Sequence, residues 1–222
     1  MRWLAEAPLH PRDGFLDRIE RLASALALWG THTNLTANPG DPREIAFHII
    51  DSLAPTALAS CDSRKSLDAG LAADASVLDI GSGAGFPGLV LAAAFDAHFT
   101  LVESRRKRAS YLEVVSHEMN LHNVTVEQRR IGPTVIQAGF NLVTGRAFGP
   151  LSDFYRIAAA ALRPSGMVLV YASAGQNLAE DAARGAGLFG PAAWEYRVPH
   201  GGRDAARIAA LWRATPAALN SP

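Results

Sequence analysis

One stretch of the chain decides the fold: Val-Leu-Asp-Ile-Gly-Ser-Gly-Ala-Gly-Phe-Pro-Gly, residues 77–88. Residues 77–80, together with Ser76, predict a short buried strand that ends at Ile80. The glycine-rich turn Gly81–Gly88 then opens a helix over residues 89–95. Glycines let the backbone approach a ligand closely, and the start of the helix presents free N–H groups. Strand, glycine turn and helix in this order are typical of an open α/β sheet that binds a ligand at its edge.

The sequence after residue 75 alternates between strand-like and helix-like segments. Strands are expected over residues 98–103, 123–126, 140–144 and 167–171, helices over 106–121 and 151–162, and a closing hairpin over 193–198 and 207–212. Strands that alternate with helices at this spacing predict an α/β fold with a Rossmann-like, doubly wound, mostly parallel sheet.

The sequence before residue 76 has a different pattern, with helix-like segments and no strand-like ones. Apolar residues at helical spacing predict a helix over residues 14–29, which Gly30 is expected to end, followed by a loop over 31–39. Asp41-Pro42 is a good start for a second helix, because Asp caps a helix and Pro fits its first turn. Residues 61–75 are rich in Ser, Asp, Gly and Ala and are interpreted as a linker. We therefore expect an N-terminal helical cap and linker, residues 1–75, on an α/β domain, residues 76–222, that forms one structural unit.

Composition excludes several classes of protein. The 222 residues contain one cysteine, Cys61, which excludes an internal disulfide framework and a cysteine-based zinc site. Apolar runs fall short of the roughly 18 residues that a membrane span requires, and Glu6 and Pro8 stand where a signal peptide would have its apolar core. We expect a soluble, cytoplasmic monomer with no metal and no membrane partner. Twenty-one basic and 21 acidic residues exclude binding by bulk charge and leave room for a local basic surface.

Two cofactor classes fit the glycine turn. Residues 83–88 match G-x-G-x-x-G and Glu103 follows about twenty residues later, as in dinucleotide-binding enzymes, where a carboxylate accepts both ribose hydroxyls. S-adenosylmethionine is favoured by the earlier glycine, Gly81, by Asp79 inside the strand, and by the limited length left for a second nucleotide-binding half. On this second interpretation Gly81, Gly83 and Gly85 cradle the cofactor, and Asp79 holds the loop or the amino acid moiety. An NAD(P)-dependent oxidoreductase stays open as the alternative.

The methyl acceptor is constrained by residues that the chain lacks. There is no Pro-Pro dipeptide, so the signature of enzymes that methylate exocyclic amines is missing. Methylation of pyrimidine C5 needs a thiolate, and Cys61 lies outside the expected sheet. A lysine base for ribose hydroxyls is hard to assemble from Lys65 and Lys107. A ring nitrogen that is already nucleophilic, such as guanine N7, needs only alignment.

Several separated strings resemble one known family, over roughly residues 15 to 171. The strings are Asn34-Leu35-Thr36, His48-Ile49-Ile50-Asp51-Ser52-Leu53, residues 79–88 with their Gly-Phe-Pro-Gly ending, Leu101-Val102-Glu103-Ser104, Lys107-Arg108, Asn123-Val124 and Arg146-Ala147-Phe148. In this order they are similar to the 16S ribosomal RNA guanine-N7 methyltransferases, also called glucose-inhibited division protein B.

The resemblance implies a class I S-adenosylmethionine-dependent enzyme that methylates N7 of a guanosine in the decoding-region loop of 16S ribosomal RNA, free or in the small ribosomal subunit. By position it implies cofactor contacts from Gly81, Phe86, the pair Ile131-Gly132 and Arg146. The chain departs from the family pattern at three places: Ile131-Gly132 replaces Ala-Glu or Val-Glu, Gly145 replaces Ser, and Tyr171-Ala172-Ser173 replaces Lys-Gly. These departures keep a second alternative open, an RNA-binding relic that has lost catalysis.

Further polar residues are candidates for contact with the substrate. We expect Arg146 and His48 to present the guanine to the methyl group, although an ion pair and a buried helix position would also explain them. Asn34, Arg105, Arg106 and Arg108 are expected to bind RNA. Asn34 would alternatively brace its loop, and the arginines would alternatively form a solvated helix start. Trp29 and Trp212 fit core packing better than base stacking.

Overall fold

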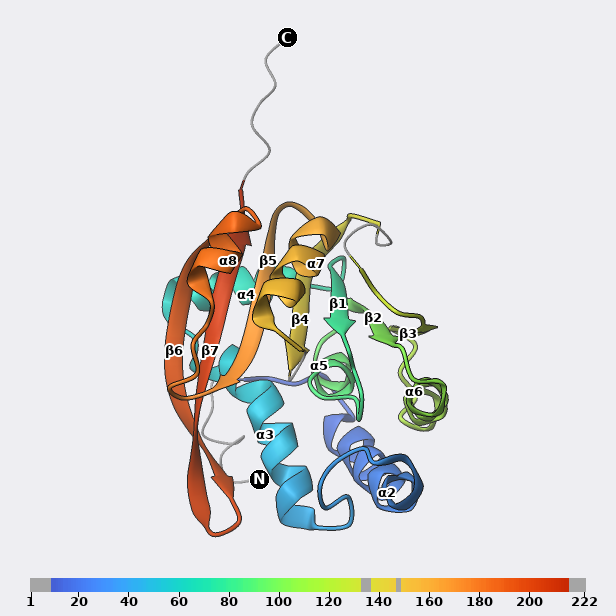
Figure 1. Cartoon of the computed structure of the whole chain (residues 1–222). Helices are drawn as coiled ribbons and strands as arrows, with labels where there is room; N and C mark the ends of the chain where they lie inside the picture. The colour runs from blue at the N-terminus through green and yellow to red at the C-terminus, as the bar shows by residue number, and fades with distance from the viewer. Residues whose placement is uncertain (1–8, 133–136, 147–148, 216–222) are drawn as a thin grey trace.

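The structure, a computed structural model, describes residues 9–132, 137–146 and 149–215. Within them, a sheet of seven strands runs in the order β3-β2-β1-β4-β5-β7-β6 (Figure 1). The strands are β1 (Ser76–Ile80), β2 (His98–Glu103), β3 (Val124–Gln128), β4 (Phe140–Arg146), β5 (Leu162–Ser173), β6 (Leu188–His200) and β7 (Arg203–Ala214). β1 to β5 pair in parallel, whereas β7 is antiparallel to both β5 and β6. The mostly parallel sheet and the closing hairpin are confirmed.

The order of the strands places a ligand site at β1. β1 lies between β2 and β4, so the chain winds away from β1 first in one direction and then in the other. At such a switch point the loops that follow neighbouring strands diverge and leave a crevice outside their carboxyl ends. Helices α2 (Phe15–Thr33) and α3 (Pro42–Leu58) lie below these ends in Figure 1. The N-terminal part of the chain therefore covers the edge of the sheet where a ligand is expected.

Two hydrophobic clusters sandwich the sheet, because successive side chains of a strand point to opposite faces. Val77 belongs to the cluster that includes residues of α2, α3, α4 (Cys61–Gly70), α5 (Gly88–Ala94) and α6 (Arg106–Glu118). Leu78 and Ile80 belong to the cluster under α7 (Leu151–Ala161) and α8 (Glu180–Gly185). The helical extension thus shares a continuous core with the sheet and does not hang from it as a separate unit.

Two expectations for the N-terminal part are wrong. Gly30 does not end the first helix, which continues to Thr33 and has its left-handed C-cap at Asn34; at Gly30 a Cβ would overlap the side chain of Pro39. Residues 61–75 are not a linker, because 61–70 form α4, in which Leu67 is fully buried. The short helix α8 was not expected. The Asp41 cap is confirmed by a 2.9 Å hydrogen bond from the Arg43 backbone N–H to its carboxylate.

The two tryptophans take the packing roles expected of them. Trp212 is fully buried, and Trp29 packs edge-on against Tyr111 with ring centroids 6.0 Å apart. No helix in the described ranges is long and apolar enough to cross a membrane.

The contact at Gly30 makes a prediction about stability. Alanine is about 1 kcal/mol more favourable than glycine inside a helix. A Cβ at Gly30 would nevertheless overlap the side chain of Pro39, and overpacking costs roughly 1–3 kcal/mol. We expect Gly30→Ala to lower the free energy of unfolding, measured by urea denaturation.

The matched control is Gly185→Ala, at the end of α8, where nothing lies within 4 Å of the new methyl group. There helix propensity acts alone, and stability is expected to stay the same or to rise. If Gly30→Ala stabilises the protein as well, the packing against Pro39 is not tight in solution.

Candidate functional site

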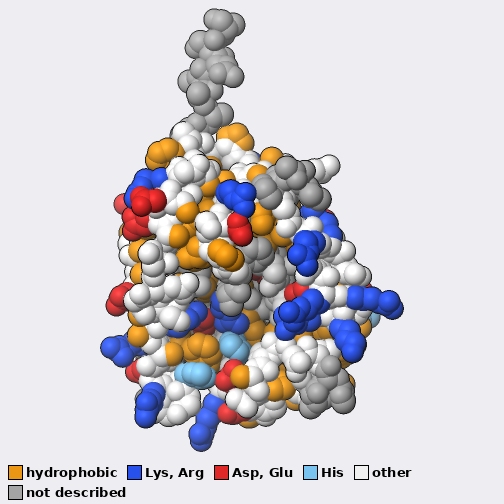
Figure 2. Space-filling model, viewed as in Figure 1, with side chains coloured by type: hydrophobic (Ala, Val, Ile, Leu, Met, Phe, Trp, Pro, Cys, Tyr) orange, Lys and Arg blue, Asp and Glu red, His pale blue; other side chains and the backbone are white. Residues whose placement is uncertain are grey.

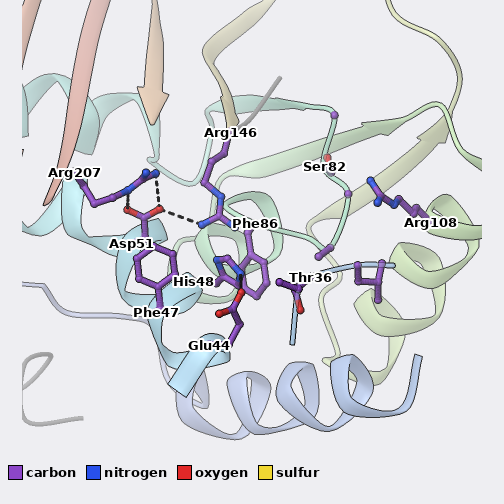
Figure 3. A pocket seen from close by; sticks show the side chains of 15 residues that line it. Thr36, Glu44, Phe47, His48, Asp51, Ser82, Phe86, Arg108, Arg146 and Arg207 are labelled. Atoms are coloured by element: carbon purple, nitrogen blue, oxygen red, sulfur yellow. Dashed lines mark hydrogen bonds and ion pairs between the residues drawn. The ribbon is translucent and has the colours of Figure 1, made fainter. Parts of the chain in front are cut away.

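A cavity of about 400 Å³ opens at the carboxyl ends of β1 and β4, between the sheet and α3 (Figure 3). Its walls come from four parts of the chain. They are the loop after α2 (Leu35, Thr36, Ala37), helix α3 (Glu44, Phe47, His48, Asp51), the turn after β1 (Gly81, Ser82, Gly83, Ala84, Phe86), and Arg108, Arg146 and Arg207. Sheet, helical extension and hairpin all contribute to this cavity.

The glycine turn is held in place by its own backbone. Gly81, Gly83 and Gly85 have φ angles of 73°, 54° and 89°, in the left-handed region that favours glycine. The N–H groups of Gly81 and Ser82 both donate to the carbonyl of Val102, at 2.9 and 3.2 Å. The turn therefore folds back over β2 and leaves its backbone facing the cavity at Gly81 and Gly83.

Glu103 braces this turn from behind. Its carboxylate accepts hydrogen bonds from the Gly83 N–H at 3.1 Å and from the Arg105 N–H at 2.7 Å, and the residue is buried. In this arrangement Glu103 lies beside the cavity without forming its wall. In this geometry Glu103 holds the glycine turn in shape. Its contact with a ribose stays a prediction.

Asp79 is a buried carboxyl group beneath the turn. Neither of its carboxylate oxygens has a hydrogen-bond partner in the described part of the chain. A Cβ added at Gly88 would lie 2.5 Å from Oδ2, so α5 begins in contact with this carboxyl group. Burial raises the pKa of Asp79 to about 7. The side chain of Ser82 and the positive charge of Arg146 act in the opposite direction and are outweighed. Asp79 is not part of the cavity wall, so it acts on a ligand through the loop or through the electric field.

Arg146, at the end of β4, is fixed by two contacts. Its Nη1 donates to Asp51 Oδ2 at 3.1 Å, and its guanidinium lies over the ring of Phe86, 5.2 Å from the centroid. Asp51 is fully buried and also accepts two hydrogen bonds from Arg207, at 2.9 and 3.0 Å, and one from the Tyr196 hydroxyl at 2.8 Å. Two guanidinium groups share one carboxylate, so the cluster keeps a net positive charge at the cavity (Figure 3).

An aromatic layer lies next to this cluster. The ring of His48 packs on Phe86 with centroids 4.9 Å apart, and Phe47 packs on His200 at 4.3 Å. Burial, together with the charge of Arg146, lowers the pKa of His48 to about 4, so this ring is neutral at pH 7. Its Nε2 lies 3.3 Å from Glu44, and its Nδ1 has no partner among the described residues.

Helix α6 contributes a second group of basic side chains at the cavity, in addition to Arg146 and Arg207. Arg108 donates to the backbone carbonyl of Asn34 at 2.6 Å, so it ties the loop after α2 to the glycine-turn side of the cavity. Arg106 and Lys107 line a neighbouring depression next to Trp29. Figure 2 shows positively charged side chains on both sides of the hollow, with histidine between them.

The structure brings together many, but not all, of the residues singled out in the sequence. Gly81, Gly83, Phe86, His48, Arg108 and Arg146 line the cavity, whereas Asp79, Gly85, Glu103, Asn34, Arg105 and Arg106 do not. Ile131 packs against the core cluster under α7, and a Cβ at Gly132 would meet nothing within 4 Å. A contact between this pair and a cofactor stays a prediction. Ala147 and Phe148 lie outside the described residues.

Three charged wall residues were missed as site residues: Glu44, Asp51 and Arg207. A carboxylate among the apolar residues of a helix, as at Asp51, is a signal that sequence reading can use, because a buried charge needs a partner. No local pattern marks Arg207, since the hairpin brings it to Asp51 across 156 positions of sequence.

Comparison with known proteins was made on this basis. The family model described as rRNA small subunit methyltransferase G matches residues 16–186. Ribosomal RNA small subunit methyltransferase G of Wolinella succinogenes is 34% identical over 72% of this chain and 76% of that protein. The protein of the same name from Halorhodospira halophila is 36% identical over 76% of this chain and 73% of that protein.

Solved structures with the same fold are more distant in sequence. The O-methyltransferase TomG from Streptomyces achromogenes, in complex with SAM, superimposes with a TM-score of 0.55 and 15% identity, over 96% of this chain and 95% of that one. The [4+2]-cyclase SpnF superimposes with a TM-score of 0.56 and 13% identity, over 95% and 98%. These two likenesses show the fold, the class I methyltransferase sheet, and leave the reaction to be argued from the site.

The Asp79 carboxyl group makes a prediction about pH. Its pKa is about 7 in the folded protein and near 3.8 when unfolded, so the folded state binds the extra proton between these values. The free energy of unfolding therefore falls as pH rises from about 4 to 7, because stability falls where the native state holds more protons. We expect Asp79→Asn to flatten this fall and to be more stable than the wild type at pH 8, by at least about 1 kcal/mol.

Urea denaturation at pH 4.5 and pH 8 measures the effect. Glu180→Gln, at an exposed position on α8, is the control and should leave the pH dependence unchanged. Equal stability of Asp79→Asn and the wild type at pH 8 would show that the native carboxyl group has found a partner or water.

Proposed function

Since this chain belongs to the rRNA small subunit methyltransferase G family, we propose that it transfers a methyl group from S-adenosylmethionine to N7 of a guanosine in 16S ribosomal RNA. The observation that carries the proposal is the cavity in which the glycine turn of β1 meets Arg146 and a positively charged surface. Its substrate is the free RNA or the small ribosomal subunit, so it acts in the cytoplasm, as a monomer, with residues 1–75 as a cap over a catalytic domain of residues 76–222.

The residues around the glycine turn fit the proposed cofactor. Gly81 and Gly83 expose backbone at the cavity wall, where a side chain would occupy the space. The unpartnered carboxyl group of Asp79 lies directly beneath and suits a ligand that carries positive charge. Phe86 supplies an apolar surface, and Glu103 holds the turn in shape. When bound there, S-adenosylmethionine would supply an electrophilic methyl group, with its sulfonium sulfur as the leaving group.

The protein's task in this chemistry is alignment. N7 has an in-plane lone pair and carries no proton, so no general base is required, and correct positioning alone is worth several kcal/mol. Arg146 is held in a single orientation by Asp51 and Phe86, and neutral His48 adds a flat surface beside it. We assign these two residues to holding the guanine against the cofactor site. Arg105, Arg106 and Arg108, with Asn34, are assigned to the RNA backbone.

The two alternatives are less well supported. An oxidoreductase that uses NAD(P) is not favoured by the comparisons, since the family and the two relatives described above are named methyltransferases. A relic without catalysis was suggested by the departures at Ile131-Gly132 and Tyr171-Ala172-Ser173, but these residues do not line the cavity.

Calorimetric titration tests the cofactor. We expect saturable binding of S-adenosylmethionine and S-adenosylhomocysteine, no binding of NADH, and loss of binding in Gly83→Arg, because the arginine side chain would fill the cradle. Gly185→Arg, far from the cavity on α8, is the matched control and should bind normally. Circular dichroism checks that both variants are folded. Binding of NADH alone would replace this proposal by the dinucleotide alternative.

Methyl transfer to ribosomal RNA tests the role of Arg146. We expect Arg146→Ala to lower kcat by about 10²–10³-fold, the usual loss for one preorganised donor in an active site. The fold should survive, because Asp51 keeps its hydrogen bonds to Arg207 and Tyr196.

Arg156→Ala, an exposed arginine on α7 paired with Asp153, serves as the control and should keep full activity. The product is measured as N7-methylguanosine after digestion of the RNA. An Arg146→Ala enzyme with normal kcat would remove Arg146 from the catalytic machinery.

A further inference from the structure

Glu44 is a carboxylate of the cavity wall that the proposed chemistry does not yet use. It projects from the first turn of α3, and its side chain is only 12% exposed. Its contacts within the described chain are with two histidine rings: Oε1 lies 3.3 Å from His48 Nε2, and Oε2 lies 3.0 Å from His200 Nε2. Each carboxylate oxygen has two lone pairs, so both oxygens retain one acceptor position.

The other carboxylate of the wall is already committed. Asp51 accepts four hydrogen bonds from Arg146, Arg207 and Tyr196. Among the described residues, the ion-pair partners of Glu44 are His48 and His200 and include no arginine or lysine, and His48 is neutral at pH 7. Glu44 therefore presents a negative charge at a cavity that is otherwise positive.

Glu44 lies where it can accept hydrogen bonds from the edge of a base bound in the cavity. In Figure 3 it lies at the opposite side of the cavity from Ser82 and the glycine turn, with the rings of His48 and Phe86 next to it. In guanine, N7 lies on the Hoogsteen edge and the N1–H and 2-amino groups lie on the neighbouring Watson–Crick edge, with the amino group across the base from N7. A guanine that has N7 at the glycine-turn side and its Watson–Crick edge at α3 places two adjacent donors at Glu44.

From this geometry we propose that Glu44 reads the guanine, by accepting hydrogen bonds from its N1–H and 2-amino group. This inference rests on the proposed function. Guanine alone among the four RNA bases offers two adjacent donors to one carboxylate, whereas adenine has an acceptor at N1. Extruded bases are commonly recognised on this Watson–Crick edge.

The same contact strengthens during the reaction. When N7 gains a methyl group, the positive charge moves onto the purine ring, and N1–H and the amino group become stronger donors. A carboxylate at this edge therefore binds the transition state more tightly than the ground state, which is the condition for raising kcat. Glu44 would act as both a specificity residue and a catalytic one.

A two-by-two comparison of enzyme and RNA tests the proposal. Wild type and Glu44→Gln are assayed on RNA with guanosine or with inosine, which lacks the 2-amino group, at the methylated position. For the wild type we expect inosine to lower kcat/KM about 10–100-fold, the range of a good bidentate contact to a base. For Glu44→Gln we expect low kcat/KM on both RNAs, with a guanosine-to-inosine ratio near one.

Two controls separate this role from a structural one. Glu180→Gln, on α8, should keep the wild-type ratio. His200→Ala removes the contact between Glu44 and the hairpin, and if Glu44 only fastens the hairpin, both variants should lose activity equally on the two RNAs and keep the wild-type ratio.

The outcomes distinguish the two proposals. Methylation of guanosine by the wild type, with an unchanged ratio in Glu44→Gln, overturns the reading role and leaves the proposed function standing. The absence of methylation on any RNA by a wild-type protein that is folded overturns both.

Discussion

The cavity depends on one buried carboxylate. Asp51 has no exposed surface and accepts hydrogen bonds from Arg146 on β4, Arg207 on β7 and Tyr196 on β6. A buried charge that loses its partners costs roughly 3–5 kcal/mol, so helical extension, parallel sheet and hairpin are linked through this one group. Because two arginines share it, the cluster stays cationic. The same interaction that links the helical extension, the sheet and the hairpin therefore sets the charge of the site.

The parts that were predicted from the sequence are those with local causes. The turn after β1 needs three positive φ angles within five residues, and the glycines at 81, 83 and 85 indicate it in the sequence. The alternation of strands and helices follows from short-range periodicity in the same way. Residues 61–75 were misread because small and polar residues look like a linker, although Ser63, Leu67 and Gly70 put one face of α4 in the core. Gly30 was misread because a close approach to Pro39, and not a turn, requires a glycine there.

The cavity was predicted only in part, because half of it is assembled by contacts between distant segments. Gly81, Gly83, Phe86 and Arg146 follow strand ends and meet by the rules of a parallel sheet. Arg207 reaches the cavity on a hairpin, and its pairing with Asp51 has no local signature. Glu103 was expected at a ribose, and the structure adds a task for it: two backbone N–H groups of the glycine turn and of the following loop bond to its carboxylate.

The two halves of the cavity have different origins and, under the proposed function, different tasks. The glycine turn belongs to the sheet, whose fold this chain shares with an O-methyltransferase and with a cyclase at 13–15% identity. Glu44, Phe47, His48 and Asp51 come from α3, which lies outside the alternating strand and helix units. The two halves meet where His48 packs on Phe86 and where Asp51 pairs with Arg146. Under the proposed function, α3 therefore holds the base and the glycine turn of the sheet holds the methyl donor.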